Sequence, residues 1–207
     1  MNIDITRRGV VGACILGGAL LAAGVMPGAR ETAQADEEGG AVRKQYGFWV
    51  DTVRCDNCGE CVKACREAHQ CEEGDPSRRT ILSLYDDFGN VRYASTSCMH
   101  CSVPSCESVC PAGAIKKRSE DGLVCVDQDR CIGCKYCYQA CPFAVPRYTE
   151  KGMDKCDGCA SLGEAPKCVE ACKRGALHYG EISELVEKTG GRARAIEAST
   201  GPNCLFS

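Results

Sequence analysis

Cysteine dominates this sequence, with 20 cysteines among 207 residues. Cysteine at this density indicates a disulfide scaffold, a metal protein or both. Sixteen of the cysteines fall into four groups of four, and each group is short along the chain. In chain order the groups are Cys55, Cys58, Cys61 and Cys65; Cys98, Cys101, Cys106 and Cys110; Cys131, Cys134, Cys137 and Cys141; and Cys156, Cys159, Cys168 and Cys172.

The third group has the most specific spacing, C-x2-C-x2-C-x3-C-P from Cys131 to Pro142. Cysteines at three-residue steps on a tight loop direct three thiolates at three corners of a [4Fe–4S] cubane. The next cysteine has entered a helix and serves a different cluster, as in bacterial two-cluster ferredoxins. The four groups therefore predict four [4Fe–4S] clusters with all sixteen cysteines as metal ligands. Because the third group keeps its four cysteines, we expect no three-iron cluster.

Two other kinds of cysteine site compete with this interpretation. Zinc sites use pairs of C-x2-C, often with histidine, and have no use for three cysteines at three-residue steps. A disulfide framework suits an exported chain, but C-x2-C-x2-C spaces the thiols too regularly for one. Composition agrees with clusters, because 6% aromatic residues and 23 glycines leave a thin apolar core that inorganic cubanes would fill. The net charge of −3 and the lack of a basic run exclude an electrostatic footprint for nucleic acid.

Four cysteines lie outside the groups. Cys14 belongs to the N-terminal segment, and Cys125 lies in a strand-like run that predicts a buried small side chain. Cys71 and Cys204 stay open, as free thiols or as a pair. Neither His69 nor His100 is taken as a ligand, and for His100 we expect one hydrogen bond near a cluster or none. For Tyr136 and Tyr138 we expect packing around a cluster.

The first 35 residues predict a targeting segment. Arg7 and Arg8 precede an apolar stretch from Val10 to about Met26, and Ala33-Gln34-Ala35 then forms a small-x-small cleavage site. This pattern is typical of a twin-arginine export signal. Such export carries folded proteins, which suits cofactors that are inserted beforehand. We therefore expect cleavage after Ala35 and a location in the periplasm or at the outer face of the cytoplasmic membrane.

Two alternatives compete for the same segment. A retained membrane anchor is disfavoured, because a spanning helix needs about 20 apolar residues and this run is shorter. Lipidation at Cys14 is disfavoured, because almost no apolar run precedes it. Beyond Ala35 no apolar stretch is long enough to span a bilayer, so we expect no direct membrane span in the mature chain.

Secondary structure between the groups is predicted from alternation and turn residues. A strand is expected over 46–53, and 80–85 with 91–96 predicts a hairpin around the turn 86–90. A second hairpin is expected over 114–126, turning near 120–122. Residues 181–188 predict a helix with Ile182, Leu185 and Val186 on one face. The last fifteen or so residues predict an irregular tail, and the whole predicts an α+β fold.

These residues carry a resemblance to a known family. The matching pieces are Cys98 to Cys106 with Cys110-Pro111-Ala-Gly-Ala114, Cys131 to Pro142, Met153-Asp-Lys-Cys156-Asp-Gly-Cys159, and Cys168 to Cys172 followed by Gly175-Ala176-Leu177. Over about residues 46–180 the sequence resembles the four-cluster electron-transfer (beta) subunit of the dimethyl sulfoxide reductase family of molybdopterin oxidoreductases. Groups one and four depart from the pattern, with Arg66 and Lys173 where the other groups have proline. Those cations either stabilise a nearby anionic cluster or are exposed charges at helix starts.

The resemblance implies which cysteines share a cluster. Group one pairs with group four, and group two with group three, as two ferredoxin-like modules with hairpin insertions. Residues 36–180 then form the four-cluster domain and 181–207 a C-terminal helix and tail. The implied sets are set one, Cys55, Cys58, Cys61 and Cys172; set two, Cys65, Cys156, Cys159 and Cys168; set three, Cys98, Cys101, Cys106 and Cys141; and set four, Cys110, Cys131, Cys134 and Cys137.

The resemblance also implies partners. We expect an electron-transfer subunit, without catalytic residues of its own, between a quinol-linked membrane subunit and an exported molybdopterin catalytic subunit. Similar subunits serve polysulfide, thiosulfate and tetrathionate reductases, so the complex stays open, and a cytochrome-type nitrite reduction system is the alternative. Other classes are an enzyme that acts alone, for which no Gly-rich nucleotide loop or catalytic constellation is visible, and a structural secreted protein, which would be colourless instead of brown.

Overall fold

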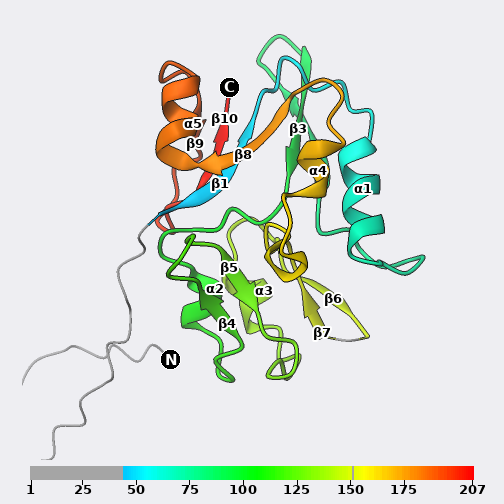
Figure 1. Cartoon of the computed structure of the whole chain (residues 1–207), viewed down its shortest axis with the longest axis vertical. Helices are drawn as coiled ribbons and strands as arrows, with labels where there is room; N and C mark the ends of the chain where they lie inside the picture. Colours follow the sequence, from blue (N-terminus) through cyan, green and yellow to red (C-terminus); the bar gives the residue numbers. More distant parts are fainter. Residues whose placement is uncertain (1–43, 151) are drawn as a thin grey trace, which may run out of the picture. The chain divides into compact units, whose positions relative to one another are not determined.

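The computed structural model describes residues 44–150 and 152–207. The expected export signal therefore lies outside the described residues, as does Cys14. Figure 1 shows a sheet with helix α5 in one half of this part and the short hairpins β4–β5 and β6–β7 in the other. Helices and strands are both present and short, so the fold is α+β. None of the helices in the described ranges is long and apolar enough to cross a membrane.

A four-stranded sheet has the strand order β8-β1-β10-β9. Strand β1 (Tyr46–Val50) pairs antiparallel with β8 (Leu177–Glu181) and parallel with β10 (Cys204–Phe206), and β9 (Arg194–Ala195) lies at the edge. The irregular tail predicted for the last fifteen residues is therefore wrong. The sequence signal was weak because β10 has three residues, and its place is fixed by long-range pairing with β1.

The two faces of this sheet are covered differently. Phe48 and Val50 on β1 are buried against a core that consists largely of cysteines. Trp49 faces the other way and packs with Leu205 and with α5 (Ile182–Lys188). In the predicted helix Leu185 is buried, whereas Val186 remains 36% exposed and does not share the buried face. The sheet thus separates the cysteines from α5.

Three hairpins complete the strands. Strands β2 (Thr80–Tyr85) and β3 (Val91–Thr96) pair as predicted, and the Asp86 carboxylate accepts hydrogen bonds from the backbone N–H groups of Phe88 and Asn90 in the turn. The second predicted hairpin is β4 and β5, and a third, β6 with β7, was not predicted. The bounds are β4 Ile115–Lys117, β5 Val124–Val126, β6 Arg147–Thr149 and β7 Gly152–Asp154.

The remaining helices are short, and most carry cysteines. Helix α1 packs against α4, and α2 packs against α3. Each pair therefore joins two segments that are distant in sequence. The bounds are α1 Glu60–Ala68, α2 Ser105–Ser108, α3 Tyr136–Ala140, α4 Lys167–Glu170 and the 3₁₀ turn η1 Ala160–Leu162.

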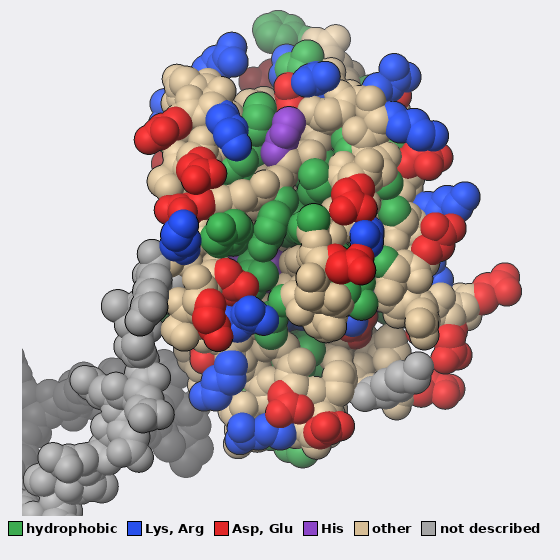
Figure 2. Space-filling view, viewed as in Figure 1, with side chains coloured by type: hydrophobic (Ala, Val, Ile, Leu, Met, Phe, Trp, Pro, Cys, Tyr) green, Lys and Arg blue, Asp and Glu red, His purple; other side chains and the backbone are tan. Residues whose placement is uncertain are grey.

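The surface seen in Figure 2 carries both signs of charge, interspersed around a central strip of apolar side chains. No single-sign patch covers this face. This distribution agrees with the small net charge of −3, and it offers no continuous basic stripe to a nucleic-acid backbone.

Candidate metal centres

Cysteines from different groups gather around common cavities. Three cavities are each lined by four of the predicted ligands, three from one group and one from another. They are lined by Cys55, Cys58, Cys61 and Cys172; by Cys98, Cys101, Cys106 and Cys141; and by Cys110, Cys131, Cys134 and Cys137.

The remaining four predicted ligands also lie together. Burial raises the pKa of the Cys65 thiol, and the neighbouring thiolates of Cys156, Cys168 and Cys159 raise it further. Cys65 is carried by α1 and Cys168 by α4, the two helices that pack against each other. This gathering again unites three cysteines of one group with one from another.

The loops that carry the first two cysteines of each group share one backbone feature. The second residue after the first cysteine has a positive φ in every group: Asn57 at 62°, His100 at 44°, Gly133 at 67° and Gly158 at 67°. Only glycine adopts this left-handed conformation without a steric cost, and asparagine tolerates it better than most residues. The conformation reverses the chain within one residue. A C-x2-C step therefore forms a tight turn in each group.

Backbone N–H groups also reach the sulfurs. The N–H of Ala114 donates to Cys110 Sγ and the N–H of Ala176 to Cys172 Sγ, both at 3.3 Å. Although burial opposes ionisation, backbone N–H groups of residues 112–115 lower the pKa of Cys110 below its ordinary value. Hydrogen bonds to the charged form have this effect because they stabilise the thiolate. The Gly-Ala sequence after each of these cysteines supplies the turn that brings the donor into place.

Most of the other shifted thiols move the opposite way. Burial is the largest cause, and it raises the pKa of Cys106 to about 12 and that of Cys168 to about 11. A thiol must lose its proton to bind a metal. Because the buried surroundings do not stabilise the thiolate, the positive charge of the bound metal has to do so. Such sites bind metal with release of protons. The buried surroundings therefore favour thiolates that are bound to a strongly cationic iron core over thiolates without a metal.

One sulfur in each gathering also lies beside a side-chain donor from elsewhere in the chain. The four donors differ in type: a serine hydroxyl, an imidazole, an ammonium group and a phenol. The pairs are Ser95 Oγ with Cys61 Sγ at 3.1 Å, His69 Nε2 with Cys159 Sγ at 3.5 Å, Lys155 Nζ with Cys98 Sγ at 3.6 Å and Tyr148 Oη with Cys137 Sγ at 3.1 Å.

Sequence reasoning missed these donors. Ser95, Tyr148 and Lys155 were not singled out, and His69 was considered only as a metal ligand. Lys155 alone had a local signal, because it directly precedes Cys156. All four donors reach their sulfurs through tertiary packing, including Lys155, whose sulfur partner is the distant Cys98. Spacing along the chain does not reveal such contacts.

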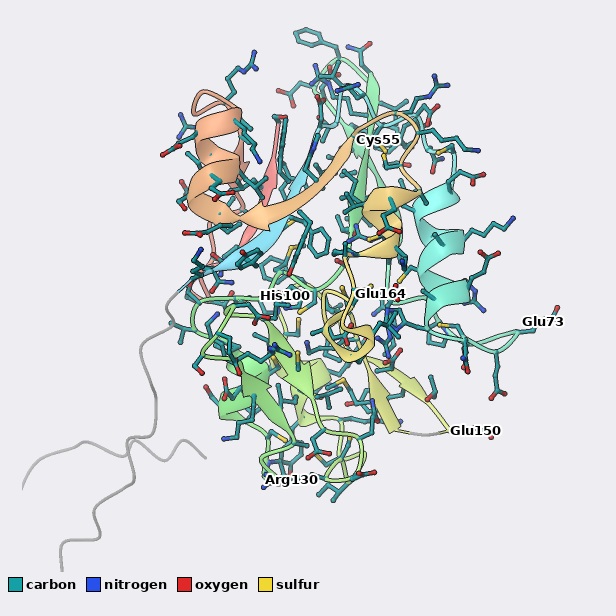
Figure 3. All side chains as sticks on the ribbon, in the orientation of Figure 1. Cys55, Glu73, His100, Arg130, Glu150 and Glu164 are labelled. Atoms are coloured by element: carbon teal, nitrogen blue, oxygen red, sulfur yellow. The ribbon has the colours of Figure 1, made fainter. Side chains whose placement is uncertain are left out.

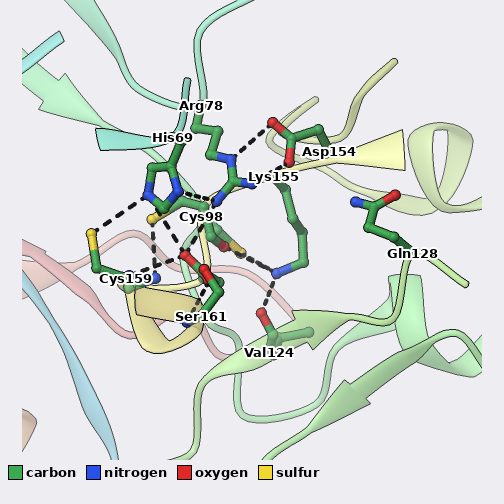
Figure 4. Close-up of polar contacts among 12 residues, drawn as sticks. His69, Arg78, Cys98, Val124, Gln128, Asp154, Lys155, Cys159 and Ser161 are labelled. Carbon is green, nitrogen blue, oxygen red and sulfur yellow. Dashed lines mark hydrogen bonds and ion pairs between the residues drawn. The ribbon is translucent and has the colours of Figure 1, made fainter. Parts of the chain in front are cut away.

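The orientation of His69 follows from its second partner, as Figure 4 shows. Arg78 Nη1 lies 3.0 Å from His69 Nδ1, and arginine has only donors. Nδ1 is therefore the acceptor, and the proton of the neutral ring is on Nε2, which faces Cys159. Burial lowers the pKa of His69, followed by the charge of Arg78, which keeps the ring neutral. Arg78 is held in turn by a 2.8 Å ion pair with Asp154.

The ring of His100 has no hydrogen bond to a sulfur among the described residues. Its Nδ1 accepts a hydrogen bond from the N–H of Val124 at 3.0 Å, and the residue is completely buried. Burial holds its pKa well below the ordinary value, so the ring is neutral. Over residues 44–150 and 152–207 the ring has this one hydrogen bond, to the backbone, and its Nε2 has no partner.

Arg66 and Lys173, which follow the last cysteine of groups one and four in place of proline, both contact oxygen atoms. Arg66 donates to the backbone oxygens of Asp75 and Glu72, and Lys173 is 80% exposed and 3.9 Å from Glu60. Both cations therefore have oxygen partners, and Lys173 is an exposed charge. Neither lies at a helix start, because Arg66 is in the last turn of α1 and Lys173 follows the end of α4. Every cysteine in the described ranges is free of a disulfide, including Cys71 and Cys204.

The ungrouped cysteines occupy different environments. Cys125 lies in β5, as the strand-like run predicted, but it is half-buried instead of buried. Cys204 is buried in β10, where burial raises the pKa of its thiol to about 12. Within the part of the chain that the structure describes, no three histidine, cysteine or acidic side chains are gathered closely enough for a single metal ion. The thiol donors and the N–H groups aimed at them fit thiolate-ligated iron–sulfur clusters.

Comparison with known proteins agrees with this chemistry. The family described as "4Fe-4S dicluster domain" matches residues 90–182, and the one described as "4Fe-4S binding domain" matches residues 54–68. The sequence is 44% identical over 161 residues to YnfG of Escherichia coli (strain K12), a probable anaerobic dimethyl sulfoxide reductase subunit, covering 70% of this sequence and 78% of the relative.

Two further relatives extend this comparison. An anaerobic dimethyl sulfoxide reductase subunit from Haemophilus influenzae is 39% identical over 170 residues, covering 72% of this sequence and 80% of that protein. Protein NrfC of Escherichia coli (strain K12) is 39% identical over 151 residues, covering 68% and 67% respectively. The similarity therefore extends over most of the described residues.

Proposed function

This chain is a member of the 4Fe-4S electron-transfer subunits of the dimethyl sulfoxide reductase family, and we propose that it carries four [4Fe–4S] clusters in two ferredoxin-like modules. Such subunits are parts of a larger reductase complex and are not its catalytic chains. When bound, the clusters supply one-electron transfer. The chain's own residues hold them, orient them and set their electrostatic surroundings.

The single observation that carries this proposal is that each set of four neighbouring cysteines combines three from one sequence group with one from another. Each of three cavities is lined by three cysteines of one group and one of another, and Cys65 lies with Cys156, Cys159 and Cys168. We therefore assign these gatherings as the ligand sets one to four defined from the resemblance. The packing of α1 on α4 and of α2 on α3 supports one module for sets one and two and another for sets three and four.

The sets follow one another in a row. Arg79 lies among thiols of sets one and two, and Lys155 among thiols of sets two and three. Sets three and four are joined by the packing of α2 on α3. Figure 3 places Cys55 near one end of the described part and Arg130, which precedes Cys131, near the other, with His100 between them. This order supports a relay with set one and set four at its ends.

Both end sets reach the surface. Cys58 of set one and Cys134 of set four are exposed, whereas Cys98 of set three and Cys168 of set two are buried. Ile132, which lines the set-four cavity, is 68% exposed, and Tyr136, next to Cys137 in sequence, is 60% exposed. Exposed apolar groups at an opening suit a docking partner. We propose that one end faces a molybdopterin catalytic subunit and the other a quinol-linked membrane subunit.

Export is part of the same proposal. Arg7 and Arg8 with the apolar run and Ala35 support twin-arginine export and removal of residues 1–35. The working location would then be the periplasm or the outer face of the cytoplasmic membrane. A second candidate, which the sequence resemblance implies, is an electron-transfer partner of a cytochrome-type nitrite reduction system.

The test is chemical analysis of anaerobically purified protein. Four clusters require close to sixteen iron and sixteen acid-labile sulfide per chain. Half that content in fully folded protein, or stoichiometric zinc, would contradict the proposal. Identification of the large protein that co-purifies with this one, by mass spectrometry, separates a molybdopterin subunit from a cytochrome partner.

A further inference from the structure

Two cations are buried in the interior without an acidic partner. Arg79 is 1% exposed and Lys155 is 2% exposed. Among the residues that the structure describes, neither forms an ion pair with a carboxylate, and Arg79 Nε has no hydrogen-bond acceptor. A buried charge without a counter-charge is strongly unfavourable. The folded chain therefore needs negative charge near both residues.

Arg79 contacts the surroundings of set one through Ser95. Its Nη1 donates to the backbone oxygen and to Oγ of Ser95, both at 3.1 Å, and Nη2 donates to Ser97 Oγ at 3.0 Å. Because guanidinium groups have only donors, the hydroxyl proton of Ser95 is left to point elsewhere. Cys61 Sγ lies 3.1 Å from that hydroxyl. Arg79 thus orients Ser95 as a donor to a ligand of set one.

Lys155 contacts the surroundings of sets two and three, as drawn in Figure 4. Its Nζ donates to the backbone oxygens of Val124 and Cys156, the latter at 3.2 Å, and lies 3.6 Å from Cys98 Sγ. The ammonium group is therefore anchored by peptide oxygens. Its charge stays beside the sulfur.

Burial lowers the pKa of both cations, and the charges that raise the pKa against it belong to cysteine sulfurs. The thiolates of Cys168 and Cys156 act most strongly on Arg79, followed by those of Cys61 and Cys65. For Lys155 the strongest is the thiolate of Cys98, followed by those of the ungrouped Cys125, of Cys106 in set three and of Cys156 in set two. Arg79 therefore lies between sets one and two, and Lys155 between sets two and three. Set two has a buried cation on each side.

We propose that Arg79 and Lys155 are the buried counter-charges of the cluster row and raise the reduction potentials of the clusters beside them, Arg79 also positioning the Ser95 hydroxyl. The inference rests on the proposed ligand sets. Uptake of one electron makes a thiolate-ligated cluster one unit more negative. A fixed cation in a low-dielectric interior stabilises that extra charge, so loss of the cation disfavours reduction.

The experiment is a dithionite titration of the anaerobically purified full chain, followed by electron paramagnetic resonance. Arg79→Met and Lys155→Met remove the charge and keep an unbranched side chain, Arg79→Lys retains the charge, and Arg92→Met is the control. Arg92 is exposed and lies on β3, in the hairpin that begins directly after Arg79. The iron and sulfide content is measured for the wild type and for every variant. A wild-type content well below sixteen of each contradicts the proposed function. A wild type with the full content but unchanged potentials in the variants contradicts only the present inference.

In Arg79→Met and Lys155→Met we expect the reduction equilibrium constant of at least one cluster to fall tenfold or more, which is 59 mV for a one-electron couple. Arg79→Lys should recover most of that shift, and Arg92→Met should show none. Potentials equal to the wild type in cluster-loaded Arg79→Met and Lys155→Met overturn the proposal. If the two neutral variants fail to load clusters, loading of Arg79→Lys supports a requirement for the charge, and its failure as well overturns the role of the charge at Arg79.

Discussion

The imidazole of His69 lies with its Nε2 atom 3.5 Å from the sulfur of Cys159, although 90 residues separate the two in sequence. Arg78 occupies Nδ1, so the ring directs its N–H at the sulfur. A donor to a ligand sulfur stabilises the more negative reduced state and raises the potential.

Replacement of His69 by leucine should therefore lower the potential of one cluster while the iron content stays at the wild-type value. A hydrogen bond is worth about 1 kcal/mol net, so we expect a shift of tens of millivolts in the titration. His178→Leu is the matched control, because His178 stacks on Trp49, away from the sulfurs. Equal potentials in both variants would show that the contact has no electrostatic effect.

Tyr148 should have the same effect on a different cluster. Its hydroxyl lies 3.1 Å from Cys137 Sγ, and Tyr148→Phe removes that group while the ring keeps its packing. We expect the potential of the set-four cluster to fall by tens of millivolts, read by the same titration. Tyr138→Phe provides the control, since Tyr138 is 43% exposed and lies on α3, the helix that carries Cys137. A shift of equal size in the control would contradict the assignment of Tyr148 as a donor to the set-four cluster.

If the ligand sets interleave as proposed, cysteines from different sequence groups should affect the same cluster when they are replaced. Cys172→Ser should perturb the same cluster as Cys58→Ser, since both residues line one cavity. Cys159→Ser should perturb another cluster. Resonance spectra of the three single variants decide the matter. If Cys172→Ser and Cys159→Ser alter the same signal, each sequence group holds its own cluster and the interleaving is wrong.

Strand β10 should contribute to stability out of proportion to its length. Leu205 is 4% exposed and packs between Trp49 and α5. Leu205→Ala should cost about 2–5 kcal/mol of unfolding free energy, seen as a lower thermal midpoint by circular dichroism. Leu84→Ala on the hairpin, where Leu84 is 42% exposed, should stay within about 0.5 kcal/mol. A similar loss in both variants would argue that β10 does not anchor the sheet.

The export signal is testable without the fold. Lysine in place of Arg7 and Arg8 keeps the charge but removes the guanidinium pair on which the proposed twin-arginine pattern depends. The variant should remain in the cytoplasm with its clusters, as judged by cell fractionation and iron content. A lysine-for-arginine change at the exposed Arg192 is the control and should leave export unchanged. Normal export of the Arg7 and Arg8 variant would contradict the twin-arginine proposal.

Spacing along the chain was enough to predict the cysteine chemistry of this protein. Cysteines such as Cys131, Cys134 and Cys137 recur at three-residue steps because a tight loop has to direct three thiolates at one core. Such a local constraint can be recognised from the spacing of the residues. The hairpin over 80–96 was predictable for the same reason, since turn chemistry is local.

The surroundings of the sulfurs depend instead on tertiary packing. Folding brings His69 to Cys159, places β10 beside β1, and buries Arg79 and Lys155 among the thiols. Pairing of distant strands and burial of charge depend on where the chain returns in space, and nothing in the spacing of a few residues records that path.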